Sequence, residues 1–457
     1  METAASTTEG TAEITRRLAE FASSLTFEEI PPEAVTVAKH CLLDWFGVTL
    51  AGAEEPLTQK LFDFVRAEGC GDHATLVGLG ARGSVSQAAL INGSASHALD
   101  YDDVLRILGG HPTVPVAPPV LALAERDLKS GKDVITAFVA GVEAEARIGG
   151  LVGDCRRQGW HTTATVGTLG AAAGSARLLG LDAETTATAF GIAATQAAGL
   201  LAVFGTMCKP LHGGKAAANG YMAAELAARG FTSRTDIIEC ERGFAETTGD
   251  AFNADIALAD LGTQYWTPNA LFKYHAACFG THAGLEGARA IRANPAFDLD
   301  KIERIDMDVP AHSLNVCNIQ EPQTGLEIKF SHRFTTALAL SGEETGALQV
   351  YSEEMASRPD LVALRDKVTV HGRDDHGPVE TAITVHQSDG TVIRERRDVS
   401  APNADLDDQW AKLETKFRAL AAPRIGEVNA ERAIALVRAL EDQEDVAALM
   451  TACSMIR

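Results

Sequence analysis

The chain has 457 residues, of which 46% are hydrophobic and 22% are charged, so it can form a large core and is not disordered over most of its length. Its 40 Lys and Arg residues against 62 Asp and Glu residues give a net charge of −22. A surface this acidic repels phosphate backbones and anionic lipid, which argues against nucleic acid and membranes as partners.

The compartment is indicated by the cysteines and the N-terminus. Eight cysteines are scattered without a CxxC pair, which excludes a zinc ribbon and suits reduced thiols. The first ten residues lack the features of a signal peptide, and no apolar run approaches the ~18 residues that a membrane span needs. We therefore expect a cytoplasmic protein whose first ten residues are flexible.

Apolar residues recur at helical spacing through the first two thirds of the sequence. One stripe runs from Ile14 to Leu25, and Pro31 and Pro32 open a second helix that ends at Gly52. Further helices, rich in Ala and Gly, are predicted at 134–148, 167–179, 183–200 and 215–228. Small residues let helices approach closely, so these segments predict a tightly packed helical bundle.

The hydrophobic period changes after Trp266. Strands are predicted around 305–309, 368–370, 383–385 and 392–393, with a hairpin turn at 388–390. Helical spacing returns from Asp405. The sequence thus predicts a mainly α protein, in which a large all-helical domain of residues 12–268 is rejoined by 404–457 and residues 269–403 form a smaller α+β lid domain.

Two glycine-rich motifs partly match known nucleotide-binding motifs, but neither has the sequence context that nucleotide binding requires. Gly78 to Gly83 matches GxGxxG, but helices rather than alternating strands and helices follow, so we interpret it as a turn. Gly213-Gly214-Lys215 lacks the first glycine and the Ser or Thr of a P-loop, and is interpreted as the start of a helix.

The densest polar cluster is the stretch HALDYDD, followed by GGHP. It brings His97, Asp100, Asp103 and His111 close together in the sequence. Solvated acids at a helix end would explain it, and so would a metal site, but no HxxxH or HExxH spacing is present. We expect neither a bound metal nor an organic cofactor.

Three further polar segments hold candidate site residues. His161 and Thr162 precede a small-residue helix whose free N–H groups could bind a carboxylate, although Thr162 or Thr163 could simply cap that helix. A Pro- and Gly-rich turn between two apolar helices holds Lys209 and His212. The segment at the change of domain contains Lys273, Tyr274, His275 and His282.

Several of these motifs, taken in order, resemble the MmgE/PrpD family over nearly the whole chain. They are HALDYDD, HPTVPVAPPVLALAE, WHTTATVGTLGAAAGSARLLGL, GTMCKPLHGGKAAANGYMAAELAARGF, KYHAACFGTHAGLEGARAI and EIKFSHRFTTALALSG. The resemblance implies a metal-independent enzyme of small polycarboxylates, usually dimeric, with a helical domain and an α+β lid. The family includes 2-methylcitrate dehydratase, cis-aconitate decarboxylase and iminodisuccinate epimerase.

The resemblance also implies which residues act. The catalytic candidates are Lys209, His111, His161, His275 and Asp100. The candidates for substrate binding are His97, Asp103, Thr162, His212, Lys273, Tyr274 and His282. A histidine suits proton abstraction next to a carboxylate because its pKa lies near neutrality, and a cation can hold the developing negative charge.

Two departures bear on the reaction. Val104 replaces the Thr that commonly follows the acidic motif in the dehydratase and decarboxylase branches, and the segment KYHAAC differs from theirs. We therefore predict a cofactor-independent epimerase, an isomerase that acts by proton abstraction on an amino-dicarboxylate such as iminodisuccinate. A dehydratase or decarboxylase of a tricarboxylate is the first alternative, and a non-catalytic binding or scaffold protein is the second.

Overall fold

The computed structural model describes residues 13–455, so the expectation of a flexible first ten residues lies outside the described residues. The chain divides into two compact units. The first runs to Phe272 and resumes at Asp405, and the second is Lys273–Ala404. The fold is mainly α with an α+β part, as predicted.

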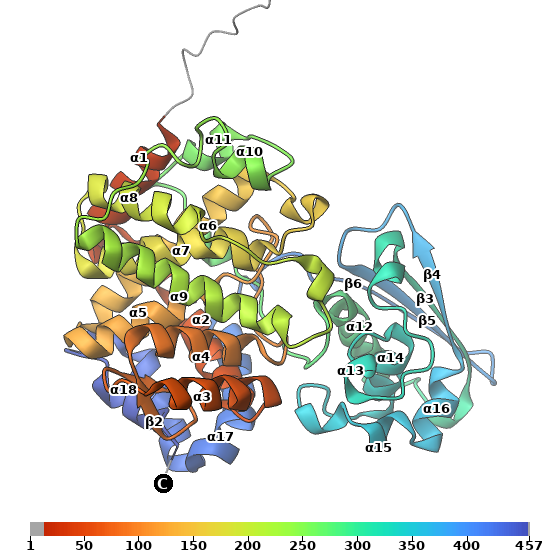
Figure 1. The fold of residues 1–457 in the computed structure, drawn as a ribbon. Helices are drawn as coiled ribbons and strands as arrows, with labels where there is room; N and C mark the ends of the chain where they lie inside the picture. The colour runs from red at the N-terminus through yellow and green to blue at the C-terminus, as the bar shows by residue number, and fades with distance from the viewer. Residues whose placement is uncertain (1–12, 456–457) are drawn as a thin grey trace, which may run out of the picture. The chain divides into compact units, whose positions relative to one another are not determined.

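The first unit is a bundle of helices (Figure 1). Its helices are α1 (Ile14–Ser24), α2 (Pro32–Gly52), α3 (Pro56–Glu68), α4 (Val85–His97), α5 (Thr113–Asp127), α6 (Gly131–Val152), α7 (Thr162–Leu179), α8 (Ala183–Ala194), α9 (Cys208–Ala228), α10 (Phe244–Thr248), α11 (Ala254–Leu258), α17 (Leu406–Arg438) and α18 (Ala447–Ala452). Helices α6 and α7 are buried along almost their whole length and form the centre of the core.

Local sequence explains where several of these helices begin. Ser84 and Ser130 cap α4 and α6 by accepting the N–H of the third helical residue, and in each case a side chain at that third position bonds back to the cap. Pro32 stands in the first turn of α2, where its missing N–H costs nothing.

Glycines allow the close helix contacts that the sequence predicted. A Cβ added to Gly93 of α4 would lie 2.9 Å from the Cα of Gly214 on α9, and one added to Gly214 would lie 2.1 Å from the carbonyl oxygen of Leu90. Only glycine fits this crossing of α4 and α9. The crossing matters for the site, because α4 ends and α9 begins beside it.

The motif from Gly78 to Gly83 is a turn, as expected. Strands β1 (Ala74–Leu76) and β2 (Ala81–Gly83) pair antiparallel as a short hairpin, and Gly78 and Gly80 adopt positive φ angles between them. No parallel sheet carries this motif among the described residues.

Several element boundaries differ from the prediction, and α6 and α7 begin earlier than expected; two differences lie near the site. Helix α8 ends at Ala194, not Leu200, because the chain turns into a loop containing Gly199 and Gly205. Helix α9 begins at Cys208, so Lys209 and His212 belong to its first turns rather than to a turn between helices. Pro210 is tolerated there because first-turn N–H groups have no partner within the helix.

The C-terminal helix α17 packs against α2. Its backbone is interrupted at Gly426, which has a φ of 77° and kinks the helix. Lys416 of α17 is buried and its Nζ lies 2.6 Å from Asp44 Oδ1 of α2 and 2.7 Å from the carbonyl oxygen of Tyr101. The ion pair links the C-terminal segment to α2, and the hydrogen bond to Tyr101 links it to the loop that follows α4.

The second unit holds a four-stranded sheet in the order β4-β3-β5-β6. Its elements are α12 (His282–Arg292), β3 (Ile302–Pro310), α13 (Gly325–Ile328), α14 (His332–Ser341), α15 (Glu353–Ala356), α16 (Pro359–Arg365), β4 (Val368–Arg373), β5 (Glu380–Gln387) and β6 (Val392–Asp398). Strand β3 runs parallel to β4 and antiparallel to β5, and β5 and β6 form the predicted hairpin.

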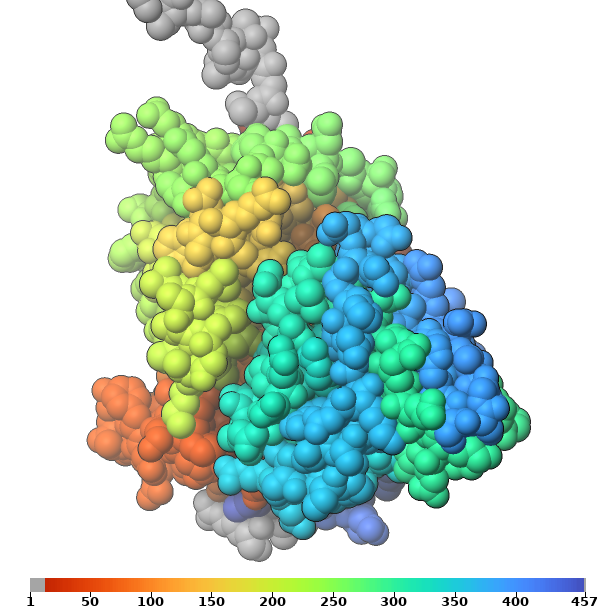
Figure 2. Space-filling model, turned by 90° about the vertical axis from the view of Figure 1, so that its right-hand side faces the viewer, coloured from red at the N-terminus to blue at the C-terminus, as the bar shows by residue number. Residues whose placement is uncertain are grey.

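Helix α12 packs on β5 and β6 and against α14, which itself contacts β4 (Figure 1). In Figure 2 the residues of this unit, coloured from green through blue-green to blue, form one continuous surface. Along β5 the side chains alternate between buried and half-buried, because one face of the sheet is covered by these helices.

None of the helices within residues 13–455 is both long enough and apolar enough to cross a membrane. All eight cysteines are free thiols.

Candidate active site

Four segments of the first unit meet at one polar cluster. The loop between α4 and α5 carries Asp100, Asp102, Asp103 and His111. His97 is the last residue of α4, His161 immediately precedes α7, and Lys209 and His212 lie in the first turns of α9. The start of α7 lies beside His161, and the positive end of its helix dipole favours negative charge, which suits a carboxylate substrate.

Lys209 and Asp100 form the half-exposed part of the cluster. Lys209 Nζ donates to Asp100 Oδ1 at 2.6 Å, and the two side chains are 16% and 28% exposed. Asp100 has a φ of 50°, a left-handed conformation that Asp tolerates better than most residues. Lys209 Nζ also lies 5.5 Å from the ring centre of Phe204. The ammonium is therefore fixed in place at the edge of the site.

Asp102 lies between two histidine rings. Its carboxylate is 3.0 Å from His97 Nδ1 and 2.8 Å from His111 Nδ1. His111 Nδ1 is also 2.8 Å from the carbonyl oxygen of Asp103, and its Nε2 lies 3.6 Å from Asp100 Oδ1. His111 thus stands between two carboxylates, with Asp102 at Nδ1 and Asp100 on the side of Nε2.

His161 and His212 contact each other through Nδ1 atoms 3.1 Å apart, so one ring donates a hydrogen and the other accepts it. Burial, assisted by His97 and Lys209, lowers the pKa of His161, which keeps this ring neutral at pH 7. Its ring stacks on His97 and is met edge-on by Phe204. His161 is therefore a neutral hydrogen-bonding group in the resting protein.

Asp103 and Thr162 are buried beneath the cluster. Asp103 accepts from Thr113 Oγ1 at 2.6 Å and so holds the start of α5. Burial raises the pKa of Asp103 to about 7. Thr162 is the first residue of α7, where neither it nor Thr163 is the capping residue, since His161 occupies that position. Thr163 Oγ1 instead accepts the backbone N–H of His111.

The remaining candidates belong to the second unit. His275 is buried, with Nδ1 2.7 Å from Thr345 Oγ1 and Nε2 3.0 Å from Glu286 Oε1. His282 Nε2 donates to the carbonyl oxygen of Ala277 at 3.2 Å. Lys273 is also buried, and Tyr274 is half-buried. A role for these residues in catalysis or substrate binding stays a prediction.

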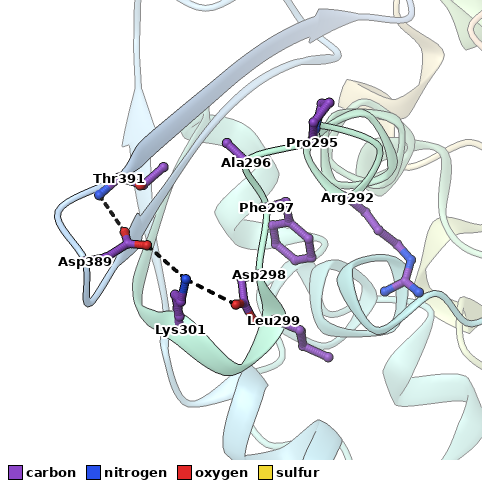
Figure 3. A pocket seen from close by; sticks show the side chains of 9 residues that line it. All are labelled: Arg292, Pro295, Ala296, Phe297, Asp298, Leu299, Lys301, Asp389 and Thr391. Carbon is purple, nitrogen blue, oxygen red and sulfur yellow. Dashed lines mark hydrogen bonds and ion pairs between the residues drawn. The ribbon is translucent and has the colours of Figure 1, made fainter.

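The second unit also has a surface hollow of about 640 Å³, which contains none of the predicted site residues (Figure 3). Its lysine, Lys301, lies 3.4 Å from Asp298 and 3.2 Å from Asp389. Arg292 donates to the carbonyl oxygen of Leu340. Because both cations already have partners within the unit, this hollow suits a polycarboxylate less well than the histidine cluster does.

The cluster contains four side chains that could together bind a metal ion, although no metal-binding motif in the sequence indicated this. His97, Asp100, Asp102 and His111 each offer a ligand atom, and these atoms lie within 4.8 Å of one another. The carboxylates in this set already have partners: Asp100 accepts from Lys209, and Asp102 contacts the Nδ1 atoms of His97 and His111. The expectation that no metal is needed stays a prediction.

The chain belongs to the MmgE/PrpD family. The N-terminal domain of that family matches residues 16–257, and its C-terminal domain matches residues 275–442. The family resemblance carried by the sequence motifs is thereby confirmed.

The chain is similar to proteins named cis-aconitate decarboxylase. It is 28% identical to that of Mus musculus over 90% of this chain and 87% of the relative, and 30% identical to that of Homo sapiens over 80% and 78%. Identity to the Aspergillus terreus protein of the same name is 27%, over 78% of each chain.

The prediction of an iminodisuccinate epimerase is wrong. It depended on Val104 and on one short segment, whereas the similarity to decarboxylases extends over most of the chain. A single substituted hydroxyl changes one contact and leaves the rest of the cluster in place. The comparisons support an enzyme of the lyase class, which was the first alternative.

Sequence reasoning did not select three residues that the structure places in the cluster: Asp102, Thr163 and Phe204. Asp102 stood beside two other acids, and nothing in the sequence distinguished them. Phe204 lies in a loop where the sequence predicted no element. A contact between distant segments carries no local signal, so only the fold reveals these roles.

Proposed function

We propose that this protein is a lyase that removes CO2 from an unsaturated polycarboxylate of the cis-aconitate type. The observation that supports this most is the combination of Lys209, Asp100 and His111 in one cluster with the similarity to cis-aconitate decarboxylases. Such a substrate is a trianion, and the cluster offers it a cation, histidine donors and the N-terminus of α7.

The reaction requires one proton and no redox partner. In cis-aconitate one carboxylate is carried by a CH2 group, and this CH2 group is attached to a carbon of the C=C bond. When the bond to that carboxylate breaks, CO2 leaves and the released electron pair forms a new C=C bond. The far carbon of the old double bond then takes a proton from an acid. The product is a methylene-substituted dicarboxylate, and solvent restores the proton to the acid.

The cluster suggests a role for each group. His111 is the proposed proton donor, since it stands between Asp100 and Asp102. Lys209 holds a substrate carboxylate and stabilises the charge that develops as CO2 leaves. His161, kept neutral by burial, donates a hydrogen bond. His97, Thr162 and His212 are proposed to line the substrate site. Asp103 is proposed to support the start of α5.

The second unit also enters the proposal. Lys273, Tyr274, His275 and His282 are proposed to contribute to substrate binding, residues 269–403 are proposed to act as a lid, and a homodimer is the proposed assembly. Lys273→Met and His275→Gln test the first point, because each should raise KM for the substrate. Thermal unfolding of both variants controls for loss of structure, since both side chains are buried.

The test is to incubate the protein with cis-aconitate and other unsaturated tricarboxylates in D2O, and to follow products by NMR together with CO2 release. We expect one CO2 per turnover and one deuterium at the carbon that was protonated. Loss or gain of water without CO2 would assign a hydro-lyase instead. No reaction with any member of the panel would refute the proposed substrate class.

A further inference from the structure

The carboxylate of Asp102 is almost fully enclosed and is shared by two imidazole rings. It is 1% exposed, and its oxygens lie 3.0 and 3.2 Å from His97 Nδ1 and 2.8 Å from His111 Nδ1. The two rings meet nearly edge to face, with centres 4.6 Å apart. One buried acid therefore fixes the orientation of both histidines at the end of α4 and the start of α5.

Hydrogen-bond accounting assigns a tautomer to each ring. An ionised carboxylate and a backbone carbonyl can only accept hydrogen bonds. His111 Nδ1 contacts both kinds of acceptor, Asp102 Oδ2 and the Asp103 carbonyl oxygen, each at 2.8 Å. Its hydrogen therefore lies on Nδ1. The same reasoning places the hydrogen of His97 on Nδ1, and leaves His97 Nε2 without a partner among the described residues.

We propose that Asp102 is a positioning residue that holds His111 in the tautomer with hydrogen on Nδ1, so that Nε2 exchanges the proton with substrate. The role of Nε2 rests on the proposed function. The tautomer itself follows from the contacts alone. Nε2 is the ring nitrogen that faces Asp100, 3.6 Å away, and through Asp100 it adjoins Lys209.

The charges around the two rings support this assignment. Burial alone would raise the pKa of Asp102, but His111 and His97 hold the pKa of this carboxyl well below its usual range. Burial lowers the pKa of His97 to about 4, against the opposing effect of Asp102. His97 is thus a neutral partner, which donates its Nδ1 hydrogen to the ionised Asp102 carboxylate. The other charged groups that face this pair are Asp100 and Lys209.

The direct test uses the resting protein labelled with ¹⁵N-histidine. Long-range ¹H–¹⁵N correlation spectra distinguish the two neutral tautomers, and the signals are assigned from their loss in His111→Gln and His97→Gln. At a pH where each signal shows a neutral ring, we expect hydrogen on Nδ1 of both. Hydrogen on Nε2 of His111 would overturn the proposal whatever the activity. A failure to release CO2 would refute the proposed function but leave this result in force.

The second test is Asp102→Asn, which keeps the shape but removes the charge and one acceptor. We expect kcat to fall about 10- to 100-fold, with KM changed less than threefold, because a charge-assisted hydrogen bond is lost. The basic limb of the pH–rate profile, where a proton donor loses its proton, should move to lower pH because the negative charge beside the ring is gone. Asp44→Asn is the matched control, since it removes another buried carboxylate, the partner of Lys416. It should lower stability without moving the profile.

Two outcomes of this second test would overturn a role for Asp102 in catalysis. One is a variant whose kcat stays within threefold of the parent. The other is a kcat loss with an unmoved pH profile and a drop in thermal stability equal to that of Asp44→Asn, which would mean a structural role. If Asp102→Asn does not fold, the spectra of the parent protein still decide the tautomer.

Discussion

Replacing Lys209 with methionine tests the proposed site most directly, because methionine keeps the length and apolar stem of the side chain and removes only the charge. Lys209 Nζ makes a 2.6 Å charge-assisted bond to Asp100. Such bonds contribute about 1.5–3 kcal/mol. If the charge acts mainly on the transition state, each 1.4 kcal/mol is a factor of ten in rate, so kcat should fall about 10- to 150-fold.

The assay is steady-state CO2 release, with kcat and KM measured separately. A fall in kcat with little change in KM assigns Lys209 to transition-state stabilisation, whereas a rise in KM alone assigns it to substrate anchoring. Lys215→Met, an exposed position on the same helix, is the control and should match the parent. Activity of Lys209→Met within threefold of the parent would refute the reasoning and remove this residue from the site.

Three further predictions follow from buried charges and from the ligand-like grouping. Lys416→Met should cost about 3–5 kcal/mol in urea unfolding, because it strands the buried Asp44 carboxylate; a loss below 1 kcal/mol would contradict this. Glu145 is fully buried with no hydrogen-bond partner among the described residues, and burial, with Asp103 nearby, raises its pKa well above the usual value. The folded protein then keeps a proton that the unfolded chain releases above about pH 4.3, so stability falls as pH rises. Glu145→Gln should therefore raise Tm at pH 7 and leave it nearly unchanged near pH 4; a lower Tm at pH 7 would refute this. Full activity is expected after exhaustive EDTA treatment, and recovery only on adding Mg²⁺ or Fe²⁺ would show that His97, Asp100, Asp102 and His111 hold a metal.

Much of the fold was predictable because it follows from local rules. Pro32 opens α2 where the sequence placed it, and the turn at 388–390 joins β5 to β6. The start of α9 was misplaced, since Pro210 and the following glycines suggested a turn. Those glycines serve a tertiary purpose: Gly214 lets α4 and α9 cross, which brings Lys209 to the end of α4. A residue that usually breaks helices can therefore stand inside one when a contact with a distant segment requires it.

The reaction could not be deduced from one substitution. Val104 removes a hydroxyl that the decarboxylase branch commonly has, and on sequence alone this absence favours a different reaction. The cluster shows why that step was too large. The cation, the histidines and the carboxylates come from four separate segments, and Val104 contributes none of them. A substitution that leaves all of these groups in place is expected to change contacts with the substrate rather than the type of reaction.

The division of labour among Asp100, Asp102 and Asp103 was also beyond sequence reasoning, although all three were visible in one motif. In an extended strand, successive side chains would alternate between two faces. Here Asp100 adopts a left-handed φ of 50°, and the loop then turns its acids in three directions. Asp100 faces Lys209, Asp102 faces His97 and His111, and Asp103 faces Thr113. Within four residues, the backbone of this loop therefore directs one carboxylate to Lys209, one to two histidine rings and one to the first residue of α5, and changes to the loop conformation should disturb all three contacts together.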